Sequence, residues 1–399
     1  MTLTRQAEDY LEAVADELEI SEARYRDAET SYKSLGDWLN RRESSLLQFS
    51  PAVYVQGSFR LGTVIKPCTD EEEYDVDSVC ELKLLNKSQL SQLQLKQRLG
   101  AEIEAYRRFK NMVKPLREGR RCWILDYADG AQFHMDVVPA LPNATGQRLL
   151  LESHGITIPY TGTAIVITDN EHKHYRFISD EWPRSNPKGY ADWFKSRMAI
   201  IFERRRRALA ENLRASVEEI PDYRIRTPLQ SAIMILKRHR DIMFANRKEV
   251  RPISVILTTL AAHSYEGEET IAAALFAILR KMDTFIQEDV SGNALIPNPT
   301  DPLENFADKW EKHPERAQAF RDWLEQARRD FGQAAMLADR WRLMEALGDR
   351  IGQSLAKRAA DRAGSRGGGL LRATSLAPVA GVPVFGSQAR VPSRPEGFA

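Results

Sequence analysis

Three aspartates are the residues of this sequence whose type and spacing could do chemistry. Asp75 and Asp77 lie in YDVDSVCELKL, and Asp136 lies in HMDVVPAL. Residues two apart on a strand face the same side, so Asp75 and Asp77 share a face, and Asp136 joins them if its strand lies beside theirs. Carboxylates brought that close repel one another and need a cation. Three hard oxygen ligands favour Mg²⁺ or Mn²⁺ over zinc.

A metal site is one of two interpretations of these acids. Two acids on an exposed strand face are usually solvated, and a D-x-D pair alone is a weak signal. The third aspartate has the apolar neighbours Val137 and Val138, which strengthens the metal interpretation. Two such ions ~3.5–4 Å apart activate a hydroxyl and stabilise a leaving phosphate. His134, two residues before Asp136, shares its face and either approaches the metal site or is hydrogen-bonded within the sheet.

A second chemical signal lies upstream of the aspartates. Gly57-Ser58 follows the apolar run AVYV and precedes FRLGTVIK, which can form a short helix. A strand–Gly–Ser–helix junction presents backbone N–H groups and a hydroxyl to an anion, and Gly57 lets the backbone approach closely. Gly-Ser alone is usually only a turn. Just before the aspartate pair, however, it predicts a triphosphate site beside a metal site.

The elements that must position these residues are strands and helices of two regions. Residues 50–170 hold the β-rich runs AVYVQGS, YDVDSVCELKL, CWILDYA and AQFHMDVVPAL, with a helix over SQLQLKQRLGAEIEAYRRF. Asp129-Gly130 predicts a two-residue hairpin between the last two runs. Helical spacing predicts one helix over residues 5–48 and an almost all-helical region from about 190, including the stretch from Asp301 to Leu347. Strands mixed with helices predict an α+β fold with helical cover.

Composition excludes several classes of protein. The chain has 399 residues and a net charge of +1, so no global field draws it to nucleic acid or membrane. The N-terminal segment carries acids early and does not resemble a signal peptide, and no apolar run reaches the ~20 residues of a membrane span. Cys68, Cys80 and Cys122 show no C-x-x-C spacing, which favours a reducing cytosol and no structural zinc.

Together, the motifs resemble a known family. QGSFRLGTVIKP, then YDVD, then HMDVVP resembles the DNA polymerase β-type nucleotidyltransferases and, more narrowly, the bacterial cGAS/DncV-like nucleotidyltransferases (CD-NTases) of CBASS anti-phage defence. The resemblance covers residues ~1–360. It implies an N-terminal spine helix and mixed sheet in a catalytic domain over 1–185, a helical nucleotide-binding domain over 186–360 with a cleft between the two, and a flexible tail over 361–399.

The resemblance implies a mechanism and a set of site residues. Asp75, Asp77 and Asp136 would bind two Mg²⁺ (or Mn²⁺), and a 3′- or 2′-hydroxyl would attack the α-phosphate of a donor nucleotide, with Asp136 as general base or hydroxyl-positioning group. A second round would close a cyclic oligonucleotide, expected to be a cyclic dinucleotide similar to cGAMP. Further nucleotide-binding residues would be Gln56, Gly57, Ser58, Lys237 and Ser254. An ammonium beside a helix N-terminus suits a triphosphate, and a solvated helix face is the alternative for Lys237 and Ser254.

The same resemblance implies partners. ATP and GTP are the expected substrates, an effector protein would bind the product, and neither membrane nor obligate nucleic acid is expected. Some CBASS operons encode a ligase that resembles ubiquitin-conjugating enzymes and couples the synthase C-terminus to other molecules, so Ala399 is a candidate conjugation site. Gly397-Phe398-Ala399 after a flexible spacer resembles those substrates.

Two competing functions remain open. Relatives that share the Gly-Ser and aspartate set transfer one nucleotide to a drug, protein or RNA end, and product analysis separates them from cyclising enzymes. A catalytically inactive nucleotide or RNA sensor is the other candidate. The presence of all three aspartates argues against an inactive protein, and the near-neutral charge argues against RNA as main ligand.

Overall fold

One mixed sheet carries the motif residues in the computed structural model, which describes residues 4–68, 74–127, 133–214, 216–217 and 222–366. The sheet order is β1-β2-β5-β4-β3, and β6 pairs with both β5 and β7. Strands β2 and β5 run parallel, whereas the other neighbours are antiparallel. The strand bounds are β1 (Pro51–Val55), β2 (Tyr74–Leu82), β3 (Arg117–Glu118), β4 (Trp123–Tyr127), β5 (Phe133–Pro142), β6 (Ile165–Ile167) and β7 (Arg184–Ser185).

The strands predicted from the sequence are confirmed. Each of the four β-rich runs overlaps one of the strands β1, β2, β4 and β5, with bounds that differ by a few residues at most. The β4–β5 pairing is antiparallel between consecutive strands, as a hairpin requires. The predicted turn at Asp129-Gly130 itself lies outside the described residues. In β2, buried Tyr74 and Val76 alternate with Asp75 and Asp77, so the acids face the cleft side of the sheet.

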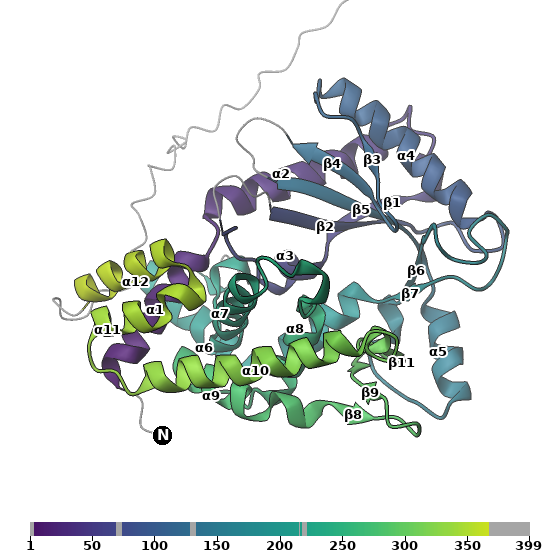
Figure 1. The fold of residues 1–399 in the computed structure, drawn as a ribbon. Helices are drawn as coiled ribbons and strands as arrows, with labels where there is room; N and C mark the ends of the chain where they lie inside the picture. The colour runs from purple at the N-terminus through teal and green to yellow at the C-terminus, as the bar shows by residue number, and fades with distance from the viewer. Residues whose placement is uncertain (1–3, 69–73, 128–132, 215, 218–221, 367–399) are drawn as a thin grey trace, which may run out of the picture.

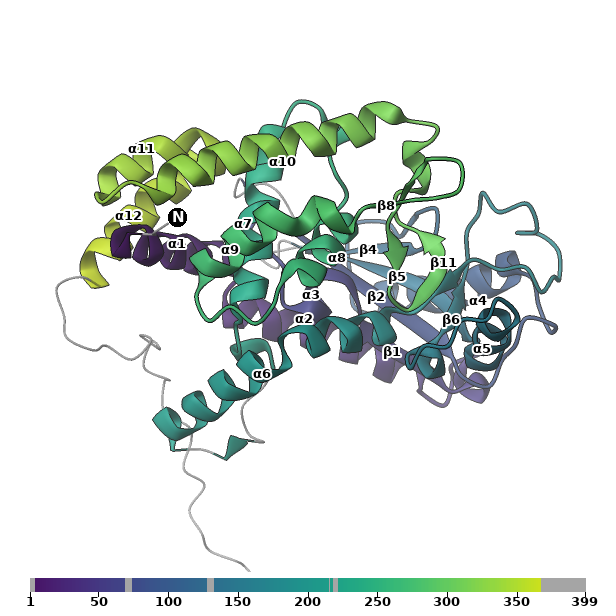
Figure 2. The same cartoon turned by 90° about the horizontal axis from the view of Figure 1, so that it is seen from below.

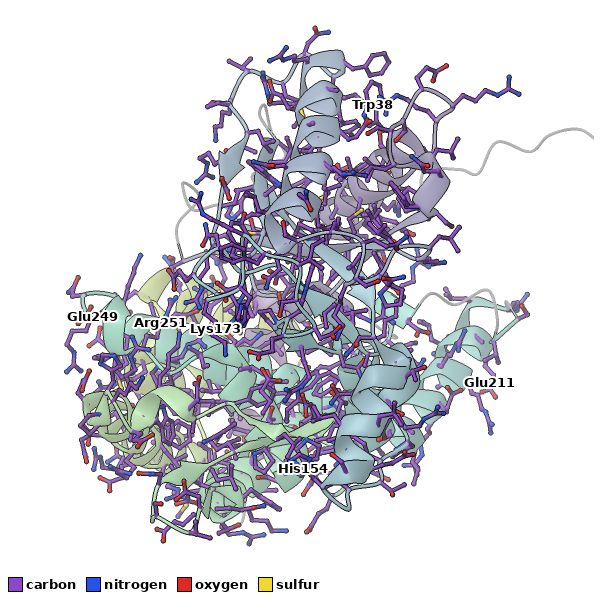
Figure 3. All side chains as sticks on the ribbon, turned by 90° about the vertical axis from the view of Figure 1, so that its right-hand side faces the viewer. Trp38, His154, Lys173, Glu211, Glu249 and Arg251 are labelled. Atoms are coloured by element: carbon purple, nitrogen blue, oxygen red, sulfur yellow. The ribbon has the colours of Figure 1, made fainter. Side chains whose placement is uncertain are left out.

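Helices α2 (Glu22–Leu39) and α4 (Gln92–Phe109) cover one face of this sheet. Leu35, Leu99 and Ile103 from the helices share a core with Met135 and Val137 of β5. The helix predicted over SQLQLKQRLGAEIEAYRRF is confirmed as α4, and Ser91 caps it by accepting a hydrogen bond from the Gln94 amide. Figure 1 shows this layer, and Figure 3 labels Trp38 of α2, whose indole N–H donates to the Glu102 carbonyl of α4 at 3.1 Å.

The single helix predicted over residues 5–48 is wrong. The segment forms two helices, α1 (Arg5–Leu18) and α2, separated at Glu19–Ser21. Ser21 caps α2 by accepting from the Arg24 amide, and buried Ile20 anchors the break. The break allows α1 to leave the sheet and pack with α7 and α12 in the helical layer.

The helical layer is built around α7 (Pro228–Met243), which is buried along almost its whole length. Pro228 occupies its first turn and Thr227 caps it, which is where both residues are favoured. Around α7 lie α6 (Pro187–Leu213), α8 (Ser254–Ser264), α9 (Ile271–Lys281), α10 (Pro314–Ala335), α11 (Arg340–Ile351) and α12 (Gln353–Arg366), while α5 (Ala144–Ser153) follows β5. Figures 1 and 2 show α1 beside α11 and α12.

Two further predictions about the region after residue 190 need correction. It contains two small hairpins, β8–β9 (Gln287–Glu288, Ala294–Leu295) and β10–β11 (Pro297–Asn298, Asp301–Asn305), so Asp301 begins a strand rather than a helix. Prolines at 297, 299 and 302 disfavour a helix there. Helix α12 continues to Arg366, past the boundary at 360 expected for the tail. Among the helices that the structure describes, none combines the length and the hydrophobicity of a membrane span.

Candidate active site

The three aspartates occupy one face of two neighbouring parallel strands. Asp77 of β2 is the register partner of Asp136 of β5, and Asp75 is the partner of His134. The His134 Nε2 atom lies 3.1 Å from Asp75 Oδ1 and 3.7 Å from Asp136 Oδ1. The predicted pairing of the two acidic strands is therefore confirmed. Of the two alternatives left open for His134, the structure favours the one in which it lies beside the acids.

Burial and mutual repulsion perturb these acids. Burial, reinforced by the negative charges of Asp75 and Asp136, raises the pKa of Asp77 to about 6. Burial also raises the pKa of Asp136. The Cys122 thiol donates to Asp136 Oδ2 at 3.4 Å, whereas Asp136 Oδ1 is buried and has no hydrogen-bond partner among the described residues. This oxygen is thus available to a ligand or to a proton.

The carboxylates fit a hard cation in their chemistry and in their shared strand face. They share a strand face, burial and the charges of Asp75 and Asp136 raise the pKa of Asp77, and the buried Asp136 Oδ1 has no hydrogen-bond partner among the described residues. Oxygen ligands suit Mg²⁺ or Mn²⁺. The side chains are not gathered around one point. In the described part of the chain, no three acidic, His or Cys side chains form a closed metal-binding group. The backbone register brings the aspartates together, and the cation itself remains a proposal.

The Gly57-Ser58 junction lies against this acidic face. Helix α3 (Gly57–Leu61) starts directly after β1, and Gly57 has φ +59. A Cβ atom at Gly57 would overlap the Asp77 carboxylate, so only glycine allows this approach.

Of the three predicted residues at this junction, Gly57 and Ser58 line the cleft between the sheet and the helical layer, whereas Gln56 does not. Gln56 instead donates its backbone N–H to the Asp77 carbonyl at 2.8 Å, a structural role. Since α3 is a single short turn, it offers hydrogen-bond donors rather than a helix dipole.

Lys237 lies on the opposite wall of the cleft and is not a solvated surface residue. The side chain is buried, and Nζ donates to the Thr63 carbonyl at 3.0 Å and to Thr63 Oγ1 at 3.2 Å. Thr63 follows α3 in the sequence, so this lysine joins the helical layer to the Gly-Ser segment. Burial, reinforced by the charge of Arg240, lowers the pKa of Lys237 to about 7, and the charges of Asp241 and Asp77 oppose this shift.

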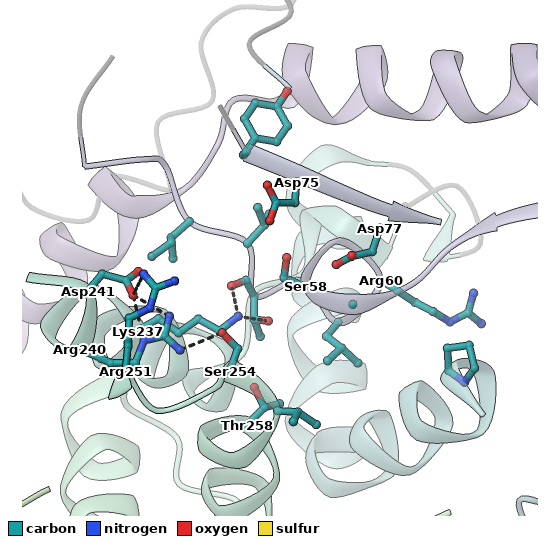
Figure 4. A pocket seen from close by; sticks show the side chains of 18 of the residues that line it. Ser58, Arg60, Asp75, Asp77, Lys237, Arg240, Asp241, Arg251, Ser254 and Thr258 are labelled. Carbon is teal, nitrogen blue, oxygen red and sulfur yellow. Dashed lines mark hydrogen bonds and ion pairs between the residues drawn. The ribbon is translucent and has the colours of Figure 1, made fainter. Parts of the chain in front are cut away.

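Ser254 is the first residue of α8, as predicted, and it is part of a basic cluster. The Arg240 guanidinium donates to Ser254 Oγ at 2.9 Å and to the Pro252 carbonyl at 3.1 Å. Asp241 accepts from Arg240 at 2.7 Å and from Arg251 at 3.2 Å, which holds both guanidinium groups at the cleft. Figure 4 shows this cluster beside Lys237, across the cleft from Asp75, Asp77 and Ser58.

One cleft of about 1000 Å³ joins the two walls. Asp75, Asp77, Gly57, Ser58, Lys237 and Ser254 all line it, so the structure brings these predicted residues together. Asp136 does not line the cleft itself and lies beside His134, which does. Ala399 lies outside the described residues, and its conjugation stays a prediction. The cleft has the size of a small-molecule site rather than a protein interface.

Sequence reasoning missed Thr63, Arg240, Asp241 and Arg251 as site residues. Arg240 follows Lys237 by three positions, and residues three apart on a helix share a face, so that signal was present. Nothing local marks Thr63, because its contact with Lys237 joins segments 174 residues apart. Arg251 pairs with Asp241, ten residues earlier, across the turn between α7 and α8, which no motif in the sequence predicts.

Comparisons of sequence place these features among known proteins. The Second Messenger Oligonucleotide or Dinucleotide Synthetase domain family matches residues 4–152. The c-di-GMP synthase of Roseivirga ehrenbergii is 32% identical over 315 residues, covering 78% of this chain and 74% of that protein. The cyclic dinucleotide synthase CdnG of Bradyrhizobium diazoefficiens is 26% identical over 415 residues, covering 93% of each chain.

Comparisons of structure confirm the predicted fold. The structure of Bradyrhizobium diazoefficiens CD-NTase CdnG in complex with GTP superposes with a TM-score of 0.66 at 22% identity, covering 89% of this chain and 98% of that one. A structure of the Vibrio cholerae di-nucleotide cyclase DncV with ATP and GTP gives a TM-score of 0.53 at 12% identity, covering 90% and 99%. At these identities the likeness concerns the arrangement of the elements.

Proposed function

The chain belongs to the cGAS/DncV-like nucleotidyltransferases (CD-NTases) and is a nucleotidyltransferase, and from this premise we propose that it makes a cyclic dinucleotide from two nucleoside triphosphates. The observation that carries the proposal is the register of Asp77 with Asp136, on a sheet face across the cleft from Lys237 and Ser254. The names of two related proteins, a c-di-GMP synthase and a cyclic dinucleotide synthase, support the class of product.

In this proposal the basic wall of the cleft holds a donor triphosphate. Lys237, Arg240 and Arg251 supply positive charge, and the first turn of α8 supplies backbone N–H groups at Ser254 that no side chain of the described residues caps. The Ser58 hydroxyl adds a donor from the opposite wall. These groups fix the α-phosphate near the acidic face, and such positioning lowers the barrier of a bimolecular step.

The acidic wall then promotes attack by an acceptor hydroxyl. Asp75, Asp77 and Asp136 would hold Mg²⁺ or Mn²⁺, whose charge would stabilise the charge that develops on the phosphate in the transition state. The acceptor 3′- or 2′-hydroxyl oxygen forms the new bond to the α-phosphorus, the bond to pyrophosphate breaks, and Asp136 takes the hydroxyl proton. A raised pKa suits Asp136 to this role, because a base works best when its pKa approaches the working pH.

The biological setting is also proposed from the family. We place the enzyme in the cytosol, in anti-phage signalling in which an effector protein binds the cyclic product. The chain has three cysteines without the C-x-x-C spacing of a zinc or redox site, which supports a reducing compartment.

Product analysis tests the proposal. Pure protein is incubated with all four nucleoside triphosphates, each α-³²P-labelled in turn, with Mg²⁺ or Mn²⁺, and the products are separated after phosphatase treatment. The Asp75→Asn/Asp77→Asn variant serves as control, and circular dichroism confirms that it folds. We expect a phosphatase-resistant product from the wild type only, at a rate at least roughly 100-fold above the variant.

Other results would change the assignment. A labelled linear product, or label transferred to an added RNA or protein, would replace cyclisation by single-nucleotide transfer. Equal product from the variant would exclude the aspartates from the chemistry.

A further inference from the structure

The β10–β11 hairpin brings a fixed amide and a carboxylate into the cleft. Asn298 and Glu304 both line it. The Asn298 Nδ2 atom donates to Glu304 Oε2 at 2.7 Å, and Asn298 Oδ1 accepts from the Thr300 amide at 2.9 Å and the Thr300 hydroxyl at 3.0 Å. Asn298 and Thr300 are buried, so this arrangement orients the Glu304 carboxylate through one of its oxygens.

Glu304 forms no ion pair with any residue that the structure describes. The neighbouring Asp301 is buried and is paired with Arg184 of β7 at 2.7 Å. Among the described residues, by contrast, no Lys or Arg lies within ion-pair distance of Glu304, and none donates a hydrogen bond to its Oε1. Glu304 is partly buried, and that burial raises its pKa. A partly buried, oriented carboxylate with a free acceptor oxygen points to a ligand that donates hydrogen bonds.

Aromatic rings lie on the same side of the cleft. Tyr190 and Phe306 both line it, with ring centroids 6.3 Å apart and planes at 74°. The Tyr190 hydroxyl bonds Thr259 Oγ1 at 2.8 Å, which fixes the ring. Flat aromatic faces bind nucleobases by stacking without preference for one base, so specificity has to come from polar groups at the base edge.

Helix α8 connects this wall to the phosphate-binding end of the cleft. Ser254 begins the helix at the basic cluster, and Thr258 lies one turn later on the same lined face (Figure 4). Thr259, the next residue, contacts Tyr190. One turn of helix rises about 5.4 Å, so a single nucleotide can bridge from the phosphates at Ser254 to the aromatic wall.

We propose that Glu304, oriented by Asn298, selects guanine at this subsite by accepting hydrogen bonds from N1–H and the 2-amino group. Guanine presents two adjacent donors on this edge, which a carboxylate matches with two oxygens. Adenine presents an acceptor at N1 and no 2-amino group, so it supplies neither of these donors and the carboxylate keeps only its hydrogen bond from Asn298. Discrimination by a missing hydrogen bond is strong, because the buried polar group of the site then stays unsatisfied. The inference rests on the proposed function and identifies guanine as the nucleobase of one of its substrates.

Three nucleotides and one isosteric variant test it. Dissociation constants of GTP, ITP and ATP are measured calorimetrically with Ca²⁺ replacing Mg²⁺ to suppress turnover. ITP differs from GTP only in lacking the 2-amino group. For the wild type we expect GTP to bind roughly 10-fold or more tighter than ITP, and ATP to bind weakest. In Glu304→Gln, GTP affinity falls by a similar factor and the GTP-to-ITP ratio approaches one, because the amide offers only one acceptor.

A matched control and the product assay separate the possible failures. Glu288→Gln changes an exposed glutamate on the neighbouring β8 strand and should keep the wild-type ratios. A Glu304→Gln enzyme that still cyclises and keeps the wild-type GTP-to-ITP ratio would overturn the inference alone. A wild type that prefers ATP would overturn it too. Absence of any phosphatase-resistant wild-type product, whatever the binding ratios, would overturn the proposed function.

Discussion

At the scale of single residues, Lys237 shows how the fold prepares a group for its ligand. A lysine buried beside Arg240 has a pKa lowered to about 7, so near neutral pH it is close to half protonated. A bound triphosphate adds negative charge nearby and favours the protonated form. Nucleotide binding should therefore take up a proton.

We predict that triphosphate binding at pH 8 takes up close to one proton in the wild type and none in Lys237→Met. Calorimetry in buffers of different ionisation enthalpy measures this number. Affinity should fall roughly 10-fold or more in the variant, because a charge-assisted contact is lost. The control is Lys248→Met, which removes an exposed lysine of the same cleft and should leave proton uptake intact. Uptake that persists in Lys237→Met would assign it to another group.

The same shift has a consequence for stability. Unfolded lysine keeps its proton to about pH 10.4, whereas folded Lys237 loses its proton near pH 7. Between these values the unfolded state binds more protons, so the free energy of unfolding rises with pH. Relative to Lys237→Met, the wild type should gain stability from pH 7 to 10 in chemical denaturation. A parallel pH profile for the two proteins would contradict this.

At the scale of elements, the β1–α3 junction determines how closely the Gly57-Ser58 backbone, which we propose contacts the triphosphate, approaches the acidic face. Gly57 has a positive φ and its missing side chain leaves room for Asp77. Two separate constraints therefore act at one position: the backbone conformation and the close approach. A second glycine in the chain has the first constraint without the second. Gly155, after α5, has φ +69, and a Cβ atom at this position would meet no other atom within 4 Å.

We predict that Gly57→Ala and Gly155→Ala each lower the free energy of unfolding by about 1–2 kcal/mol, the cost of a left-handed conformation. Only Gly57→Ala should also lower the rate of product formation, by roughly 100-fold, because the methyl group displaces the Asp77 carboxylate. Denaturation and turnover measurements on both variants separate the two effects. Full activity in Gly57→Ala would show that the close approach does not matter.

At the scale of the whole molecule, the first and last described helices close the helical layer together. Arg358 and Arg362 of α12 pair with Glu17 of α1 at 3.0 and 2.8 Å, and the Tyr10 hydroxyl donates to the Ala356 carbonyl at 3.1 Å. Helix α1 also packs on α7, the helix that carries Lys237. The cleft wall that we propose binds the nucleotide thus depends on both sequence ends of the described fold.

We predict that Ala359→Asp lowers the free energy of unfolding by roughly 3 kcal/mol and weakens nucleotide binding. Ala359 is fully buried in α12, and the substitution places an unpaired carboxylate in the core. Lys357→Asp introduces the same residue at an exposed position of the same helix and should change stability by less than about 0.5 kcal/mol. Equal stability of the two variants would exclude a tight α1–α12 contact.

Local periodicity in the sequence was sufficient to predict the strands β1, β2, β4 and β5, the shared face of Asp75 and Asp77, and the Gly-Ser junction. These features depend on neighbours within a few residues, and the alternation of apolar and polar residues along a strand is visible in the sequence itself. The same reasoning wrongly joined α1 to α2 and predicted a helix at Asp301, because a cap at Ser21 and an Asn298-stabilised turn interrupt weakly marked segments.

Only the tertiary structure decided which strands pair and what each polar side chain faces. The parallel register of β2 and β5 brings Asp136 to Asp77, and the Thr63 carbonyl meets Lys237 across 174 residues of chain. The sequence by itself therefore determines the three aspartates and the strand face that Asp75 and Asp77 share. Three features arise only when distant segments pack: the convergence of the aspartates, the burial of Lys237 and the position of Glu304 in the cleft. Burial and long-range contacts are properties of the packed core rather than of any local stretch of sequence.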